Sequence, residues 1–130
     1  MQPLADLLGE AISFCTETVG EHAASAVADL EDGDIMLMEN TRFHPGEEKN
    51  DPAFSQLLAE LGDLYVDDAF SAAHRARAST EGVAQVLPAF AGLAMQREID
   101  HLVAALEAPQ RPVIALVGGA KVSTKIDLLQ

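Results

Sequence analysis

The sequence predicts an α/β protein with a doubly wound, mainly parallel sheet, and two observations support this fold class. Short apolar runs alternate with helical patterns along the chain, which calls for right-handed crossovers between parallel strands. Two of the runs, at Ile35–Met38 and residues 113–117, are apolar without interruption, as in strands that are covered on both faces. In such folds, ligands bind beyond the carboxyl ends of the strands.

The first third of the chain is predicted to form two strands, each preceded by a helix. These elements are expected at residues 4–8, 11–15, 21–30 and 35–38. Gly9 ends the first helix, and residues 32–34 form a turn before the second strand. Because the chain opens within a helix, we expect that a further segment once preceded it.

The helix that begins at Pro52 carries the clearest signals in the chain. Asp51 can cap its free N–H groups, and proline fits the first helical position. Apolar residues recur along one helix face, at Phe54, Leu57, Leu58 and Leu61. Gly62 ends the helix, and a strand is expected at residues 63–66.

The last part of the chain is predicted to contain one long helix and one more strand. A short turn or helix leads to Pro88. Apolar residues at helical spacing after Met95 indicate an amphipathic helix that ends before Pro109. The strand at residues 113–117 follows, and Ser123 is expected to cap a final helix.

The composition is that of a globular protein, and it limits the kinds of partner. The chain has 130 residues, of which 48% are hydrophobic, and no apolar run reaches the roughly 18 residues of a membrane span. The net charge of −13 disfavours nucleic acids and anionic membranes as partners, so an anionic ligand requires local cations. Without a secretion signal, we expect a cytoplasmic protein in which the single Cys15 is reduced and buried.

A basic segment stands out in this acidic chain. Residues 69–80 contain Arg75 and Arg77 but no acidic residue, and Asp67 and Asp68 precede them directly. Because the segment follows a predicted strand, it is a candidate site for a phosphate or a carboxylate. The alternative is a surface loop whose arginines pair with those two aspartates.

Arg42 follows the strand at Ile35–Met38 and can offer a planar guanidinium group to the same kind of anion. The alternative is an ion pair with Glu39 or Glu47. Glu47 and its neighbour Glu48 form a charge run so short that we expect only a solvated loop there.

The histidines and the two adjacent aspartates give weaker signals. His44 and His74 each lie near an arginine and can bind anions, but isolated histidines are more often structural. No histidine and cysteine have the spacing of a zinc site, so no metal ligand is expected. Asp67 and Asp68 point to opposite faces of a strand, so we expect them to make structural contacts.

Gly118 and Gly119 follow the last predicted strand and open a second candidate anion site. Two glycines let the backbone approach a bulky anion, and the helix after them offers free N–H groups. Lys121 and Lys125, four residues apart, can reach that anion from one side. The spacing differs from that of both common glycine-rich phosphate motifs, so a simple tight turn is the alternative.

Several stretches, in order along the chain, resemble the sequences of phosphoglycerate kinases. The longest, at residues 38–52, reads Met-Glu-Asn-Thr-Arg-Phe-His-Pro-Gly-Glu-Glu-Lys-Asn-Asp-Pro. The others are at residues 68–70, 73–76, 79–82 and 111–126. The resemblance covers essentially the whole chain, whereas the chain covers only about a third of a family member.

The resemblance implies an enzyme of two α/β domains, with the acid substrate on the first and Mg-ATP on the second. Residues 1–91 would form part of the domain that binds 3-phosphoglycerate, in an incomplete Rossmann-like fold. Residues 92–107 would form the interdomain helix, and residues 108–130 would form the start of the nucleotide-binding domain.

The resemblance also implies roles for single residues in the reversible phosphoryl transfer between 1,3-bisphosphoglycerate with ADP and 3-phosphoglycerate with ATP. Arg42 and Arg75 match the family's contacts to the substrate phosphate. Lys121 matches the lysine that stabilises the transferred phosphoryl group. Lys125, with the glycine pair at residues 118–119, matches the contacts to the nucleotide phosphates. Mg²⁺ would arrive with ATP or ADP, because the family's metal-binding aspartate lies outside this chain.

The chain departs from the family pattern at several positions. Arg77 stands where the family often has histidine, which implies a structural role, and Asp67 stands where asparagine is usual. The family's first strand and most of its nucleotide domain have no counterpart, so we expect the isolated chain to be inactive. Two alternatives remain open: a module that binds anions without a nucleotide, and a fragment that self-associates through apolar edges, although the family is usually monomeric.

Overall fold

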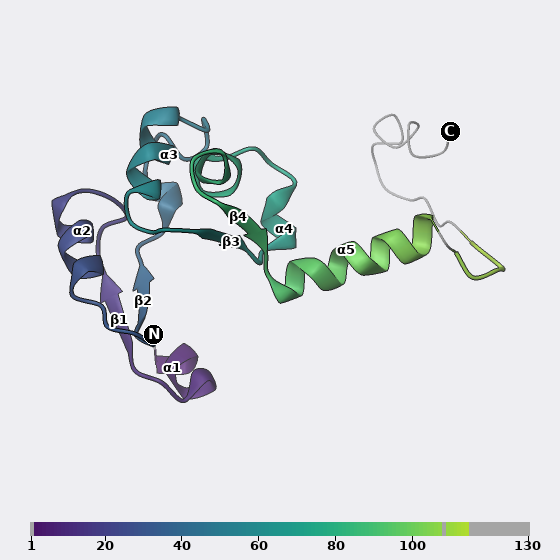
Figure 1. Ribbon diagram of the computed structural model, residues 1–130, viewed down its shortest axis with the longest axis horizontal. Helices are drawn as coiled ribbons and strands as arrows, with labels where there is room; N and C mark the ends of the chain where they lie inside the picture. The colour runs from purple at the N-terminus through teal and green to yellow at the C-terminus, as the bar shows by residue number, and fades with distance from the viewer. Residues whose placement is uncertain (1, 108, 115–130) are drawn as a thin grey trace. The chain divides into compact units, whose positions relative to one another are not determined.

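The computed structural model describes residues 2–107 and 109–114 (Figure 1). The chain divides into two compact units, Met1–Glu98 and Ile99–Gln130. All strands of the described residues lie in the first unit, where they alternate with helices and pair in parallel. This arrangement confirms the predicted α/β class.

The first strand pair joins β1 (Ile12–Cys15) to β2 (Ile35–Met38), and the two strands run parallel. Helix α1 (Gln2–Leu8) precedes β1, and helix α2 (Glu21–Ala28) connects the two strands (Figure 1). Gly33, in the turn before β2, has a φ of 95°, a conformation that glycine adopts without a steric penalty. All of these elements lie within a few residues of their predicted positions.

The two faces of this strand pair differ in their exposure. On the more buried face, Cys15 is 2% exposed and its Sγ lies 3.7 Å from His22 Nδ1. Phe14 and Leu37 lie opposite each other in the register, and they are 41% and 39% exposed. The prediction that Ile35–Met38 is covered on both faces is therefore wrong, whereas the predicted burial of Cys15 is confirmed.

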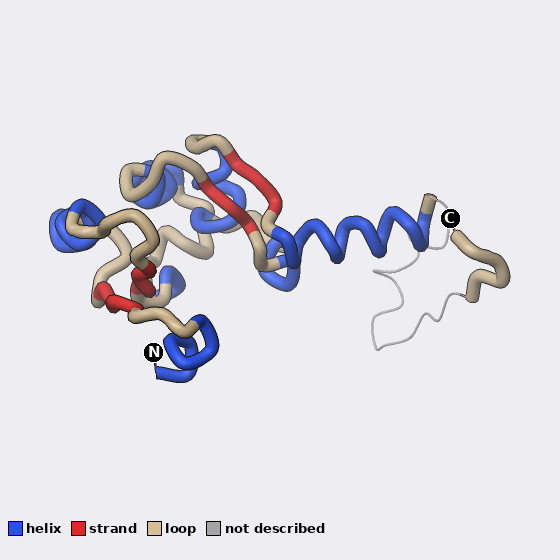
Figure 2. The backbone as a smooth tube through the Cα atoms, turned by 60° about the horizontal axis from the view of Figure 1, so that its bottom comes forward, coloured by secondary structure: helices blue, strands red, loops and turns tan. Residues whose placement is uncertain are grey.

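The second strand pair joins β3 (Tyr65–Asp67) to β4 (Ala89–Ala91), again in parallel. The sequence placed β3 two residues too early and did not predict β4. The limits of β3 and β4 are set by the hydrogen bonds between the two strands. At the two ends of the pair, Tyr65 N donates to Pro88 O at 2.9 Å and Gly92 N donates to Asp67 O at 2.8 Å. The described strands thus form two separate pairs, which Figure 2 shows in red, rather than one continuous sheet.

Helix α3 (Pro52–Ala59) begins as the sequence predicts. The Oδ1 atom of Asp51 accepts a hydrogen bond from Phe54 N at 2.9 Å, which caps the helix. Phe54 is 1% exposed, whereas Leu57, three residues later, is 39% exposed. Only part of the predicted apolar face is therefore buried in the core.

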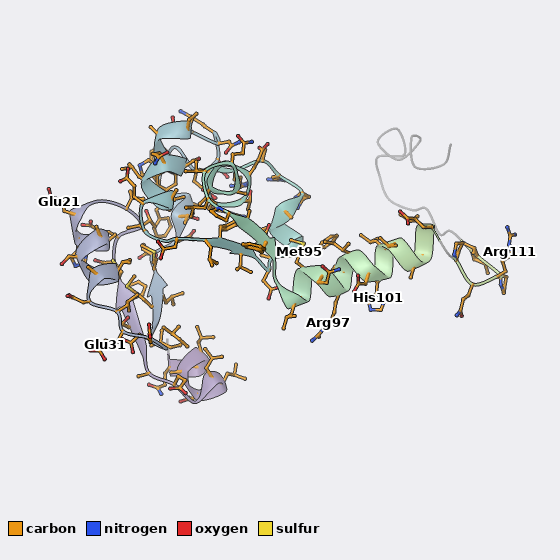
Figure 3. All side chains as sticks on the ribbon, viewed as in Figure 1. Glu21, Glu31, Met95, Arg97, His101 and Arg111 are labelled. Atoms are coloured by element: carbon orange, nitrogen blue, oxygen red, sulfur yellow. The ribbon has the colours of Figure 1, made fainter. Side chains whose placement is uncertain are left out.

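Helix α5 (Leu93–Leu106) matches the predicted amphipathic helix, but its cap comes from elsewhere in the chain. Gly92 precedes the helix and has no side chain to cap it. The Oδ1 atom of Asp68 accepts hydrogen bonds from Ala94 N at 2.6 Å and from Met95 N at 2.9 Å. Met95 is buried at the start of the helix, where Figure 3 labels it. Asp68 therefore has a structural role, but its partners are backbone N–H groups rather than the side chain of an ion pair.

The predicted strand at residues 113–117 falls mostly outside the described residues. Val113 and Ile114 are described, and they are 58% and 79% exposed and belong to no strand. The helix predicted after Ser123 lies wholly outside the described residues. In the part of the chain that the structure describes, none of the helices has the length and hydrophobicity needed to span a membrane.

Candidate functional site

Arg42 lies in a short 3-10 helix, η1 (Thr41–Phe43), directly beyond β2. Asn40 caps this turn, because its Oδ1 accepts a hydrogen bond from Arg42 N at 3.0 Å. The Arg42 side chain is exposed and makes no ion pair within the described residues. The alternative of an ion pair with Glu39 or Glu47 is wrong, because both carboxylates accept hydrogen bonds from backbone N–H groups instead.

Arg75 lies beyond the carboxyl end of β3, after a short helix that the sequence did not predict, α4 (Phe70–Ala73). Its side chain is exposed and, among residues 2–107 and 109–114, makes no ion pair. The alternative of pairing with Asp67 and Asp68 is wrong as well. Asp67 Oδ1 accepts a hydrogen bond from Ala69 N at 3.0 Å, and Asp68 caps α5.

Arg75 lines a hollow of about 260 Å³ on the protein surface. The other lining residues are Asp67, Ala73, His74, Ala76, Thr80 and Glu81. Arg42 does not line this hollow, so the two guanidinium groups do not share it. Because the lining includes two carboxylates, the hollow is not a purely cationic pocket.

Arg77 has a different environment from that of Arg75, two residues earlier. It is 6% exposed, and its Nη1 donates to Glu48 Oε1 at 2.9 Å. A buried guanidinium group needs such a partner, because an unpaired buried charge is strongly unfavourable. The ion pair agrees with the structural role that the sequence assigned to Arg77.

Glu47 is the residue of this region that the sequence analysis misjudged. It is 1% exposed rather than solvated. Its Oε2 accepts a hydrogen bond from Ser79 N at 2.9 Å, and its Oε1 accepts one from Ser79 Oγ at 2.5 Å. Nothing in the local sequence distinguishes Glu47 from Glu48, because the partner lies 32 residues away.

The segments that carry the two exposed arginines are joined to each other. We call residues 40–51 the Arg42 segment and residues 73–82 the Arg75 segment. Besides the Glu47–Ser79 contact, Ala78 N donates to Glu47 O at 3.1 Å, and Asn50 Nδ2 donates to Glu81 Oε2 at 2.8 Å. The structure therefore brings the two segments together, although the arginine side chains do not contact each other.

The two histidines of these segments differ in their surroundings. His44 stacks on Phe54 with ring centroids 3.8 Å apart, and its Nδ1 accepts a hydrogen bond from Gly46 N at 3.1 Å. His44 is thus a structural residue. His74 is exposed in the hollow, where its Nδ1 donates to Ser71 O at 2.7 Å.

Tyr65, in β3, reports on the electrostatics beneath the site. Its burial, and then the negative charges of Asp67 and Glu47, raise the pKa of Tyr65 to about 12. The shift therefore reflects mainly the burial of the ring, to which the two carboxylates add.

Gly118, Gly119, Lys121 and Lys125 lie outside the described residues. Within residues 2–107 and 109–114, no group of three or more histidine, cysteine, aspartate or glutamate side chains is arranged to hold a metal ion.

Comparisons with known proteins agree on one family. The family model described as "Phosphoglycerate kinase" matches residues 1–130. The chain is 74% identical over 129 residues to a phosphoglycerate kinase of Maricaulis maris and 65% identical over 127 residues to one of Methylorubrum populi. These alignments cover 99% and 98% of this chain but 32% of each relative, so the chain spans about a third of their length.

Solved structures give the same result. The phosphoglycerate kinase of Coxiella burnetii is similar to this chain with a TM-score of 0.80 and 40% identity, over 98% of this chain and 31% of that one. The enzyme of Pyrococcus horikoshii OT3 is similar with a TM-score of 0.85 and 30% identity, over 98% and 33%. Together with the family match over its whole length, these similarities mean that the chain belongs to the phosphoglycerate kinase family.

Proposed function

We propose that this chain contributes the acid-substrate side of a phosphoglycerate kinase. In this proposal, residues 1–91 are part of the domain that binds 3-phosphoglycerate, residues 92–107 are the interdomain helix and residues 108–130 begin the nucleotide-binding domain. The observation that carries the proposal is the family match over residues 1–130. The side chains of Arg42 and Arg75, which are exposed beyond β2 and β3 and make no ion pair with any residue that the structure describes, support it.

The proposed reaction moves a phosphoryl group between ATP and the carboxylate of 3-phosphoglycerate. It needs no general base, because a carboxylate is already ionised near neutral pH. Catalysis then consists of holding two polyanions in line and neutralising the migrating charge. We propose that Arg42 and Arg75 bind the substrate phosphate and that Lys121 stabilises the migrating phosphoryl group.

The nucleotide phosphates are assigned to Lys125 and to the backbone at Gly118 and Gly119. Mg²⁺ supplies charge neutralisation on the nucleotide when it is bound. We infer from the family resemblance that the ion enters with ATP or ADP, and no cluster of metal ligands is present among residues 2–107 and 109–114. A cytoplasmic enzyme without nucleic acid or membrane partners is consistent with this chemistry and with the net charge of −13.

Titration with 3-phosphoglycerate tests the phosphate site. We expect saturable binding to the chain, measured by NMR chemical shifts, and a loss of affinity of about tenfold or more in Arg42→Ala and in Arg75→Ala, as a lost charge-assisted contact implies. Arg97→Ala is the matched control, because Arg97 is also exposed but lies on α5. No binding at millimolar ligand, or equal losses in all three variants, would exclude the assigned phosphate site.

Self-association is a second candidate property, and the paired apolar side chains favour it. Phe14 and Leu37 face each other across β1 and β2, and Val66 and Phe90 are opposite each other across β3 and β4. All four are 39–59% exposed. Apolar patches on a strand pair with open edges invite contact between copies.

Light scattering tests this candidate. We expect the molar mass of the chain to rise with concentration and to fall back toward the monomer in Phe14→Ser. Phe43→Ser is the control, because Phe43 is 74% exposed but lies in η1 rather than on a strand. A molar mass that stays at the monomer value at all concentrations would exclude self-association.

A further inference from the structure

Glu47 holds the Arg75 segment through both of its carboxylate oxygens and through its backbone. Ser79 donates its N–H group at 2.9 Å and its hydroxyl at 2.5 Å to the carboxylate, and Ala78 N donates to Glu47 O at 3.1 Å. The carboxylate is 1% exposed, so water does not compete for these hydrogen bonds. This contact is the most buried polar link between the two segments.

On one side, the contact continues to Arg42 through consecutive backbone hydrogen bonds. Glu47 N donates to His44 O at 3.1 Å, and His44 N donates to Thr41 O at 3.0 Å, next to Arg42. The His44 ring is anchored by its stacking on Phe54. Glu47 is therefore tied by backbone hydrogen bonds to the turn that carries Arg42.

On the other side, the contact continues to Arg75 through Thr80. The Thr80 hydroxyl donates to Arg75 O at 3.0 Å and accepts from Arg77 N at 3.2 Å. Since Thr80 follows Ser79 directly, the backbone at Arg75 is tied to the residue that Glu47 holds.

The other links between the two segments are more exposed. Glu48, which pairs with Arg77, has a side chain that is 67% exposed, and the hydrogen bond between Asn50 and Glu81 is also exposed. The Arg77 guanidinium group is buried and needs Glu48 as its partner, but the exposed Glu48 side chain is solvated and holds its partner less rigidly than the buried Glu47 carboxylate holds Ser79. The Glu47–Ser79 contact is thus the link whose loss would most change the spacing of the segments.

We propose that Glu47 and Ser79 are positioning residues that fix Arg75 relative to Arg42 and thereby set the affinity for the phosphate of an acid substrate. The inference rests on the proposed function for its ligand, but the positioning itself is a property of the chain without ligand. Neither residue needs to touch the substrate.

The positioning is tested without ligand by electron paramagnetic resonance. In a Cys15→Ser background, nitroxide labels at Phe43→Cys and Ala76→Cys, both exposed and each next to one of the arginines, report the distance between the segments. We expect Ser79→Ala to broaden and shift this distance distribution. We expect Glu47→Gln to keep it, because the amide oxygen can accept from Ser79 N while the amide group donates to the Ser79 hydroxyl.

Ser55→Ala is the matched control for loss of a serine hydroxyl. Ser55 is 2% exposed, and its Oγ donates to Asp51 O at 2.9 Å within the first turn of α3 rather than between the segments. We expect this variant to leave the distance distribution unchanged. An unchanged distribution in Ser79→Ala, or an equal change in Ser55→Ala, overturns the positioning.

The consequence for the ligand is tested by titration of the same variants with 3-phosphoglycerate. We expect Ser79→Ala to weaken binding about tenfold and Ser55→Ala to leave it unchanged. If Ser79→Ala changes the distance but not the affinity, the proposed effect on the ligand is wrong. If the unmodified chain does not bind at all, the proposed function fails for this chain, and the distance measurement still decides whether Glu47 and Ser79 position the segments.

Discussion

At the scale of single residues, three arginines that look alike in the sequence have two different roles. Arg42 and Arg75 are exposed beyond strand ends and make no ion pair in the described part of the chain. Arg77 is buried against Glu48. Burial decides between these roles, because a buried guanidinium group needs a permanent partner, whereas an exposed one is available to a ligand.

Tyr65 gives a prediction at this scale, because it is the only tyrosine of the chain. Its pKa is raised from an ordinary value of 10.0 to about 12, first by burial and then by Asp67 and Glu47. We expect the tyrosinate absorbance at 295 nm to rise with a midpoint near pH 12 in the folded chain and near 10 in urea. A folded-state midpoint near 10 would contradict the environment described for this ring.

The raised pKa of Tyr65 also determines how the stability of the chain changes with pH. Above pH 10 the unfolded chain loses the Tyr65 proton while the folded chain still holds it, so unfolding becomes more favourable as the pH rises toward 12. Below pH 10 Tyr65 is protonated in both states, so its titration adds no pH dependence to the stability there. Lysines also titrate in this window, so the difference between the chain and Tyr65→Phe isolates the contribution of the tyrosine.

At the scale of elements, helix α3 is capped by a residue next to it in the sequence, whereas helix α5 is capped by a residue far from it in the sequence. Asp51 caps α3 from the position directly before it, and this cap follows from the sequence alone. Asp68 caps α5 from 26 residues away, because Gly92 has no side chain and lies close to the Asp68 carboxylate. A substituent on Gly92 would overlap Asp68, so the glycine permits the cap.

Asp68→Ala tests the non-local cap. Loss of the carboxylate leaves Ala94 N and Met95 N without their acceptor, and we expect the chain to lose about 1 kcal/mol of stability, as for other helix caps. Urea denaturation followed by circular dichroism measures the loss. Asp63→Ala is the control, because Asp63 is exposed in the loop before β3, and equal losses in both variants would refute the cap.

At the scale of the whole molecule, the chain spans about a third of the length of its relatives, at 32% of each. Its strand pairs expose apolar side chains such as Phe14 and Phe90. Phosphoryl transfer requires that both phosphate-bearing ligands be held in line and shielded from water. In the function that we propose, Arg42 and Arg75 bind only one of those ligands.

We therefore expect no catalysis by the isolated chain. A coupled assay with ATP, Mg²⁺ and 3-phosphoglycerate should give turnover no higher than that of Lys121→Ala. Turnover that is present in the chain and lost in Lys121→Ala would reverse this expectation and place the catalytic machinery within these 130 residues.

The sequence by itself determined the features that depend on neighbouring residues. The parallel α/β class, the end of α1, the start of α2, both limits of β2, the cap at Asp51 and the amphipathic helix α5 all follow from local spacing and composition. Several sequence motifs in order along the chain, of which residues 38–52 are the longest, also identified the family without any structure.

Only the tertiary structure decided the features that depend on residues far apart in the chain. β4 has three residues and no strand signal of its own, and it exists because it pairs with β3. Glu47 and Glu48 are adjacent and chemically identical. Glu47 is nevertheless buried and accepts hydrogen bonds from Ser79, whereas Glu48 is exposed and forms an ion pair with the buried Arg77. The environment of such a side chain depends on which distant residues fold against it. Only the folded chain buries these contacts, and a buried hydrogen bond is stronger than one that is exposed to water.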